Sequence, residues 1–174
     1  MALRTWKICL LVVLAFWPLA GAASAAEKIA VFPFDLLIQK SEEDFFNGPK
    51  GPTPDEQRRL DTALAKLKEL LAADGRYEVV DLSPLSDEIK AAAPLTECNG
   101  CAADLTVKAG AKLAMTSVVD KISETHLSLN VVITDVADNK VISNSSVLIQ
   151  GNTDEAWLHG VRWLAKNRLL AEGK

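Results

Sequence analysis

The chain has few of the residues on which metal and redox chemistry usually depend. Its 174 residues include three cysteines and two histidines, and neither histidine has a second ligand at the spacing of a zinc site. His126 falls on the polar side of an alternating segment, and His159 falls on the charged side of a predicted helix. Both histidines are therefore expected to face solvent rather than to bind a metal.

Catalytic constellations and phosphate-binding loops are also missing. Gly48-Pro49-Lys50-Gly51 has neither the spacing of a phosphate-binding loop nor the Lys-Ser or Lys-Thr pair that ends one. The acidic run at 42–44 lacks the glycine-containing loop of alternating carboxylates that calcium sites use. No pair of a nucleophile and a base stands out. The sequence therefore predicts no cofactor and no metal, and it favours a protein that is not an enzyme.

Basic residues are fewer than acidic ones, and part of the positive charge lies in a segment with the pattern of an export signal. Two basic residues precede an apolar run from Ile8 to Ala20, and Ala23-Ser24-Ala25 supplies the small residues that signal peptidase accepts. The run is too short to span a bilayer comfortably. We therefore expect residues 1–25 to be a cleaved signal peptide. Residues 26–174 would then form a single periplasmic domain with no membrane span.

Loss of the signal makes the chain more acidic. Without Arg4 and Lys7, the 19 basic residues fall to 17 against 23 acidic ones, which gives a net charge of −6. An acidic chain with no basic stripe is not expected to bind nucleic acid or anionic lipid. About 149 residues suffice for one domain with its own core. The expected partner is another envelope protein.

The mature region alternates between strand and helix signals. Apolar runs predict strands at 28–36, 76–82 and 112–123, and a hairpin of two further strands at 125–136 and 141–149. Pro33 is expected to mark the end of ladder bonding in the first strand. The order β-α-β-α-α-β-β-β-α predicts an α/β fold of the α+β kind. It would be a single domain with a mixed sheet of about five strands, a carboxyl-terminal antiparallel meander and helices packed on it.

Caps and apolar stripes locate the helices. Thr53 and Glu56 form a capping box, and Gly75 is placed to end the helix in the left-handed conformation. Shorter helices are expected between Ser83 and Pro94 and from 102 to 109, and a last helix after Thr153. The core-facing residues of the first and last helices are predicted to be Leu60, Leu64, Leu67, Leu71, Trp157, Val161 and Leu164.

Cys98 and Cys101 are the only cysteines that would remain after signal cleavage. Asn99-Gly100 permits the turn that closes a small ring between them. In an oxidising compartment we expect a structural disulfide that fixes the start of the helix near Ala102. A thiol–disulfide exchange centre is the alternative, because a helix amino terminus favours a thiolate. Ala102 excludes covalent haem attachment, which needs a histidine there.

A contact surface is suggested by aromatic residues outside the core stripes. Trp163 lies off the stripe of the last helix, beside the small residues Ala156 and Gly160. Phe45 and Phe46 lie in a predicted loop at 41–51. Trp163, Phe45 and Phe46 are candidate partner contacts, with the exposed face of the meander beside them. The alternative is that Trp163 simply packs under the loop that carries Phe45 and Phe46.

Several segments carry a resemblance to bacterial envelope modules. These segments are Ile29-Ala30-Val31-Phe32-Pro33-Phe34, residues 108–117 and residues 135–142. They resemble a set that includes the amino-terminal domain of the Tol system's propeller protein (TolB) and the curli secretion lipoprotein (CsgG-like modules). The cysteine pair, Gly151-Asn152-Thr153-Asp154-Glu155-Ala156-Trp157 and residues 167–170 resemble, more narrowly, a secreted bacterial family of unknown function, DUF2380.

The resemblance implies a module that docks or assembles in the cell envelope rather than one that catalyses. The chain lacks the lipidation cysteine and the long membrane-inserting hairpins of the curli protein, so pore formation is not expected. The predicted function is therefore non-enzymatic binding or scaffolding in the periplasm. The alternative is a thiol–disulfide accessory that uses Cys98 and Cys101.

Overall fold

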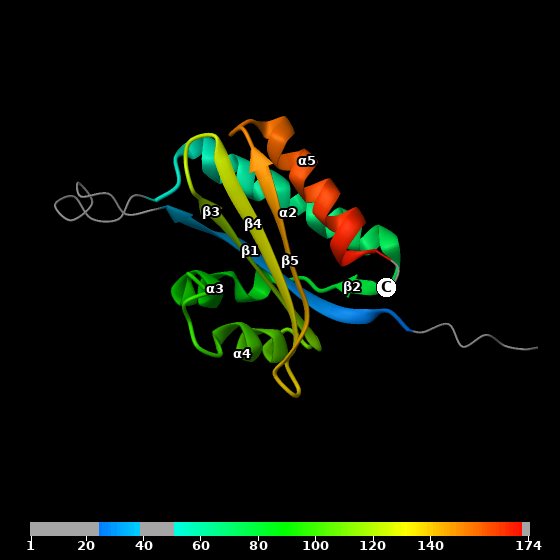
Figure 1. The fold of residues 1–174 in the computed structure, drawn as a ribbon. Coiled ribbons are helices and arrows are strands. Elements are labelled where there is room, and N and C mark those ends of the chain that lie inside the picture. The colour runs from blue at the N-terminus through cyan, green and yellow to red at the C-terminus, as the bar shows by residue number, and fades with distance from the viewer. Residues whose placement is uncertain (1–24, 39–50, 172–174) are drawn as a thin grey trace, which may run out of the picture.

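The computed structural model describes residues 25–38 and 51–171. Its elements follow the predicted order (Figure 1). They are β1 (Glu27–Ile38), α2 (Pro54–Asp74), β2 (Tyr77–Val79), the short η1 (Ser83–Leu85), α3 (Ser86–Ala92), α4 (Cys101–Lys108), β3 (Leu113–Lys121), β4 (His126–Asp135), β5 (Lys140–Gln150), α5 (Asp154–Leu164) and the π-helical η2 (Ala165–Leu169).

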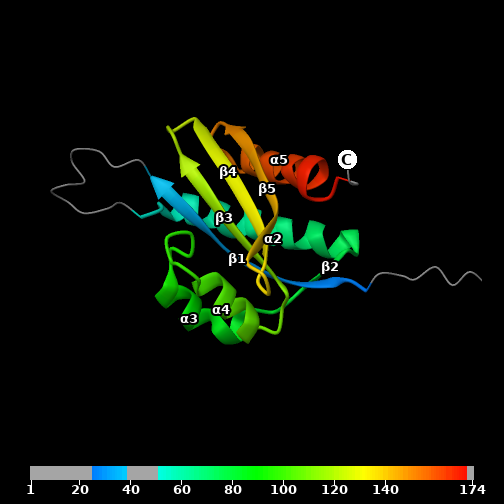
Figure 2. The same ribbon diagram turned by 60° about the horizontal axis from the view of Figure 1, so that its bottom comes forward.

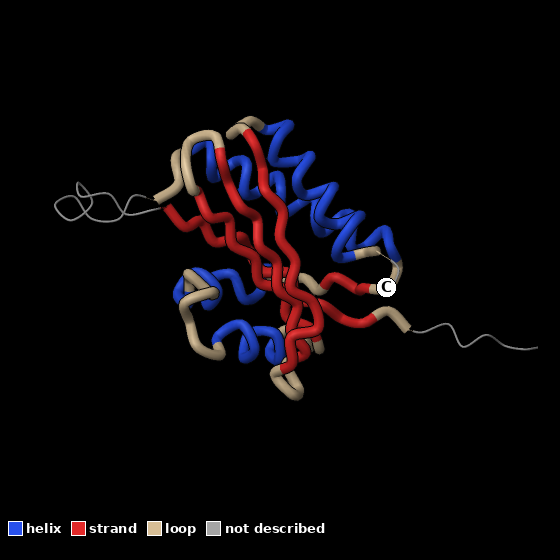
Figure 3. Tube along the Cα trace, in the orientation of Figure 1, coloured by secondary structure: helices blue, strands red, loops and turns tan. Residues whose placement is uncertain are grey.

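The five strands form one mixed sheet in the order β2-β1-β3-β4-β5. β1 runs parallel to both β2 and β3, whereas β3, β4 and β5 form an antiparallel meander. Helices lie in the connections between parallel strands, whereas short turns connect the three antiparallel strands (Figure 3). The predicted single α/β domain with a mixed sheet is confirmed.

The prediction that ladder bonding stops at Pro33 is wrong. β1 continues to Ile38, and its register against β3 shifts between Val31 and Phe34. A bulge of this kind tolerates a residue with no N–H to donate. The extra residue also reverses the alternation of side chains. Phe32 therefore packs in the core under α3 and α4, whereas Phe34 packs in the core under α2 and α5.

The second strand is shorter than predicted. β2 has three residues, and the chain leaves the sheet after Val80, whose amide donates to the carbonyl of Ile29. Asp81 then accepts hydrogen bonds from the amide and hydroxyl of Ser83, which turns the chain toward α3. Side-chain competition for backbone groups of this kind ends strands in favour of turns.

The helix caps were predicted correctly. The hydroxyl of Thr53 accepts from the amide of Glu56, while the Glu56 carboxylate accepts from the amide of Thr53. Gly75 ends α2 with a φ of 83°, a conformation that glycine adopts without a Cβ clash. Thr153 caps α5 by accepting from the amide of Ala156.

Two cores lie on opposite faces of the sheet. The larger core packs α2 and α5 on one face and contains most of the predicted stripe residues, with Leu64 at its margin. The smaller core packs α3 and α4 against β1 and β3 on the other face. In Figure 2, α3 and α4 lie under this half of the sheet and leave the β4–β5 hairpin clear. The sheet is thus covered on both faces at β1 and β3 but on one face at β4 and β5.

Candidate functional site

The outer edge of the sheet at β5 is long and uncharged. β5 has 11 residues, lies last in the strand order, and carries no charged side chain and no proline after Lys140. The amide of Gly151 donates to the carbonyl of Thr125. Because antiparallel pairs alternate, the N–H and C=O groups of Asn144, Ser146 and Leu148 point away from β4 to the free edge. In the described part of the chain, no further strand pairs with these groups.

A groove of about 500 Å³ runs along this edge between β5 and α5. Its floor is formed by residues 147–150 of β5, and its wall by α5 residues that include His159, Gly160 and Trp163. Gly160 lets the helix approach the strand closely, because a Cβ there would lie 2.7 Å from Cγ1 of Ile149. Gly160 and Trp163 both line the groove.

Exposed apolar side chains gather at the same edge. Among the described residues, seven large hydrophobic side chains are exposed, and four of them lie on β5 or α5. These four are Val141, Ile142, Leu148 and Trp163, with exposed fractions of 55%, 46%, 66% and 39%. Large apolar side chains exposed along a free strand edge can be buried when that edge forms an interface. The guanidinium of Arg168 lies 5.6 Å from the centroid of the Trp163 ring.

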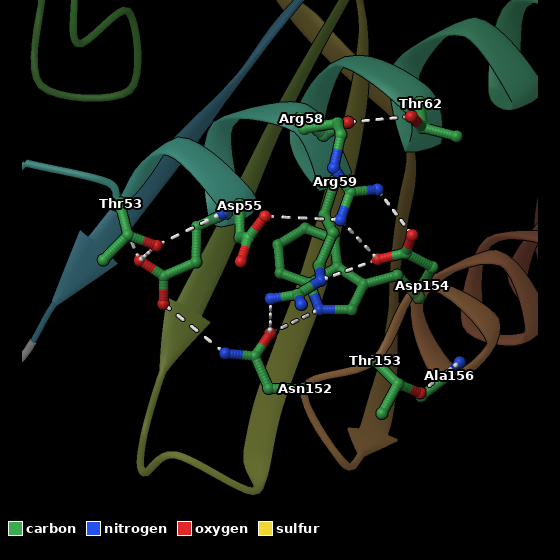
Figure 4. A network of polar contacts seen from close by, with 11 residues as sticks. Thr53, Asp55, Arg58, Arg59, Thr62, Asn152, Thr153, Asp154 and Ala156 are labelled. Atoms are coloured by element: carbon green, nitrogen blue, oxygen red, sulfur yellow. Dashed lines mark hydrogen bonds and ion pairs between the residues drawn. The ribbon is translucent and has the colours of Figure 1, made fainter.

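A polar network holds α5 and the end of β5 against α2 (Figure 4). The side-chain oxygen of Asn152 accepts from the indole N–H of Trp157 at 3.0 Å and from Arg59 at 3.2 Å. Asp154 accepts from both Arg58 and Arg59. These arginine hydrogen bonds lower the pKa of Asp154 to about 2, so that the carboxylate is ionised at neutral pH. The network fixes the wall of the groove relative to the sheet.

A buried ion pair anchors the start of α2 to β3. The Nζ atom of Lys121 lies 2.8 Å from Oε1 of Glu56, and the two side chains are 11% and 4% exposed. Burial by itself would raise the pKa of Glu56, but hydrogen bonds from Lys121 and Thr53 outweigh it and lower the pKa to about 2. Glu56 therefore makes two interactions at once: it closes the capping box and it pairs with the charge of Lys121. The charge pairing was not foreseen, because Lys121 follows Glu56 by 65 residues.

The aromatic contact residues are only partly accounted for. Trp163 lies off the core stripe, as its helical position indicated, and lines the β5–α5 groove. Phe45 and Phe46 lie outside the described residues, so their role as partner contacts stays a prediction. His126 and His159 are exposed. Among the described residues, no group of three His, Cys, Asp or Glu side chains could hold a metal ion.

Cys98 and Cys101 are joined in a disulfide, with their Cα atoms 5.6 Å apart. Cys101 is the first residue of α4 and packs against the smaller core, and Gly100 before it has a φ of 89°. The preceding loop is tied to β1 by Asp35, which accepts from the amide and hydroxyl of Thr96. The bridge lies on the opposite side of the sheet from α5, so it is separate from the groove.

No helix in the described part of the chain is long and apolar enough to cross a membrane.

The open β5 edge was missed from the sequence, since a strand pattern does not reveal which strand is outermost. Its signal was nonetheless present, because residues 141–150 contain no charge to guard an edge.

Several solved structures of bacterial proteins are similar to this chain. A PelC dodecamer from Paraburkholderia phytofirmans has a TM-score of 0.50 at 13% identity, covering 82% of this chain and 87% of that one. The LpoB C-terminal domain from Escherichia coli has a TM-score of 0.49 at 15% identity, covering 75% and 87%. Lipoprotein GNA1162 from Neisseria meningitidis has a TM-score of 0.48 at 17% identity, covering 72% and 81%.

At these identities the likeness is one of fold. No curated protein matches the chain. The family predicted from the sequence is confirmed by a match that spans both cores and the whole sheet. The chain belongs to the family described as "Protein of unknown function (DUF2380)", whose model matches residues 27–169.

Proposed function

We propose that the protein is a non-enzymatic binding module of the bacterial cell envelope, and that it engages a protein partner along the β5–α5 groove. The observation that carries this proposal is the coincidence at one edge of a long unguarded strand, a groove and four exposed apolar side chains. An extended segment that pairs with such an edge gains main-chain hydrogen bonds, while neighbouring pockets select its side chains.

The opposite edge of the sheet supports this choice of surface. Natural sheets blunt their edges with short strands, charges, prolines or bulges. The β2 edge is three residues long and therefore offers little backbone to a second strand. The β5 edge is 11 residues long, and its one irregularity lies near the Lys140 end. An edge left open in this way is explained most simply by a partner that covers it.

Export through residues 1–25 is part of the proposal. The apolar run and the small residues after it supply the pattern of a cleaved signal, which would deliver the domain to the periplasm. PelC, which shares the fold, is described as a dodecamer. This title supports an assembling role for a domain of this shape.

Site-specific photocrosslinking in living cells tests the proposal. A photoreactive residue at His159, an exposed position in the groove wall, is expected to give a discrete crosslinked product. The same residue at Val107 of α4, which is also exposed but lies on the other side of the sheet, is the control. Leu148→Lys should abolish the His159 product. Equal crosslinking at both positions, or none at His159, would contradict the assignment of the groove.

A further inference from the structure

We propose that the segment paired with β5 is β5 of a second copy of this chain, antiparallel about a two-fold axis that passes between the two Ser145 residues. This inference rests on the proposed function, because it names the occupant of the same edge. It starts from the sequence Val-Ile-Ser-Asn-Ser-Ser-Val-Leu-Ile at 141–149, which has apolar residues at both ends and polar residues in the middle.

The strand is self-complementary when it is centred on Ser145. In an antiparallel pair with this centre, Asn144 lies opposite Ser146 of the second copy, and Leu148 lies beside the bulged Ile142 of the second copy. Ile142 and Leu148 are both exposed in the single chain, and each dimer would bury two such pairs. Cross-strand apolar pairs stabilise sheets. A self-complementary patch of this kind is what a two-fold interface requires.

The backbone geometry agrees with the same centre. The groups that point to the free edge belong to Asn144, Ser146 and Leu148, as fixed by the hydrogen bond from Gly151 to Thr125. Asn144 and Ser146 would therefore form hydrogen-bonded pairs with the second copy. The two Ser145 residues between them would form a non-hydrogen-bonded pair, in which Cα atoms come within about 4.5 Å of each other.

The groove is filled by the same arrangement. Centring on Ser145 places Ser143 of the second copy opposite Val147. Val141 lies beyond the register shift at Ile142 and does not take part in this filling. Val147 and Ile149 form part of the groove floor. The small side chain of Ser143 leaves room below α5. Because residues 141–150 carry no charge, the two strands meet without electrostatic repulsion.

Cysteine crosslinking tests the register. Ser145→Cys, in the protein expressed with its own leader and purified without reductant, should form a disulfide dimer, since the expected Cα separation suits a disulfide. Ser143→Cys is the matched control, because Ser143 is also half-buried and faces the same side of the sheet. Its two copies would lie about 13 Å apart along the strands and should not crosslink. Crosslinking of both variants, or of Ser143→Cys alone, would overturn the register.

Sedimentation equilibrium separates this inference from the broader proposal. The wild-type protein should dimerise, and Leu148→Lys should weaken dimerisation at least about tenfold, whereas Val107→Lys, at a similarly exposed site, should not. A monomeric wild type that still gives a Leu148-dependent crosslink to a different protein at His159 overturns self-pairing and leaves partner docking standing. A monomer with no crosslink at His159 overturns both.

Discussion

The two halves of the sheet are built differently. Around β2, β1 and β3, helices cover both faces and the outer edge is three residues long. Around β4 and β5, a helix covers one face, the other face is open, and the outer edge is 11 residues long. The first half contains the buried ion pair, the disulfide and most of the buried side chains. The second half contains the groove and four of the exposed large apolar side chains.

This difference separates the residues that stabilise the fold from those that bind a partner. Changes in the half around β2, β1 and β3 should lower the free energy of unfolding and leave association intact in the molecules that remain folded. Changes at the β5 edge should weaken association and leave the free energy of unfolding nearly unchanged. The variants below are ordered by their expected cost in free energy of unfolding. Each has an outcome that would contradict the difference between the two halves of the sheet.

Phe32→Ala should cost the most. The Phe32 side chain is fully buried between β1 and the helices α3 and α4, and truncation of a buried phenylalanine typically costs about 3–5 kcal/mol. Equilibrium unfolding in urea measures the loss. A cost below about 1 kcal/mol would mean that the smaller core contributes little and that the two halves are less distinct than their packing indicates.

Glu56→Gln should cost about 3 kcal/mol, because it leaves Lys121 buried without its main counter-ion. Glutamine can still close the capping box, so the loss reports on the charge rather than on the cap. Glu124→Gln is the control, since Glu124 also contacts Lys121 but is 81% exposed. Its cost should stay within about 0.5 kcal/mol. Equal costs for the two variants would contradict the role assigned to burial.

The same carboxylate should make stability depend on pH. The pKa of Glu56 is lowered from 4.5 to about 2 in the folded chain. Its contribution is therefore complete above about pH 4.5, where the carboxylate is ionised in both states, and is lost as the pH falls toward 2. Thermal unfolding of the wild type between pH 6 and pH 2 should show this loss, and Glu56→Gln should flatten the curve in that window.

The double variant Cys98→Ser/Cys101→Ser should cost about 2 kcal/mol, the low end for a disulfide, because the closed loop is very short. Association through β5 should not change. Loss of association, or of a cellular phenotype, at unchanged stability would instead favour the thiol–disulfide interpretation of the pair.

Leu148→Lys should have the smallest effect on unfolding, within about 0.5 kcal/mol, because the side chain is already 66% exposed. It should nevertheless abolish pairing at the β5 edge, where a lysine guards against strand addition. Urea unfolding at a concentration low enough to keep the wild type monomeric measures the stability term. A cost above about 2 kcal/mol would show that Leu148 supports the fold itself.

Local rules allowed most of the fold to be predicted. The capping box at Thr53, the left-handed Gly75 and the alternation from Leu127 to Ile133 depend on neighbours within a few residues, and the structure contains all three. Pro33 predicted too early an end to the ladder, because a bulge tolerates a proline that a regular strand would not.

The candidate site was harder to predict because it depends on the arrangement of distant segments. Which strand lies outermost is decided by the packing of the whole sheet, so the unguarded residues of β5 could not be assigned to an edge. The approach of α5 to Ile149 depends on Gly160, whose close contact has no local signal. Trp163 could be identified as lying off the core stripe, but its groove could not be foreseen.

Hydrogen exchange at β5 tests the central claim most directly. In an isolated chain, the amides of Asn144, Ser146 and Leu148 face the free edge and should exchange rapidly, whereas those of Val147 and Ile149 are bonded to β4 and should be protected. The account predicts that all five amides are protected in the assembled wild type, and that Leu148→Lys selectively exposes the first three. Rapid exchange of Asn144, Ser146 and Leu148 in the assembled wild type would contradict it.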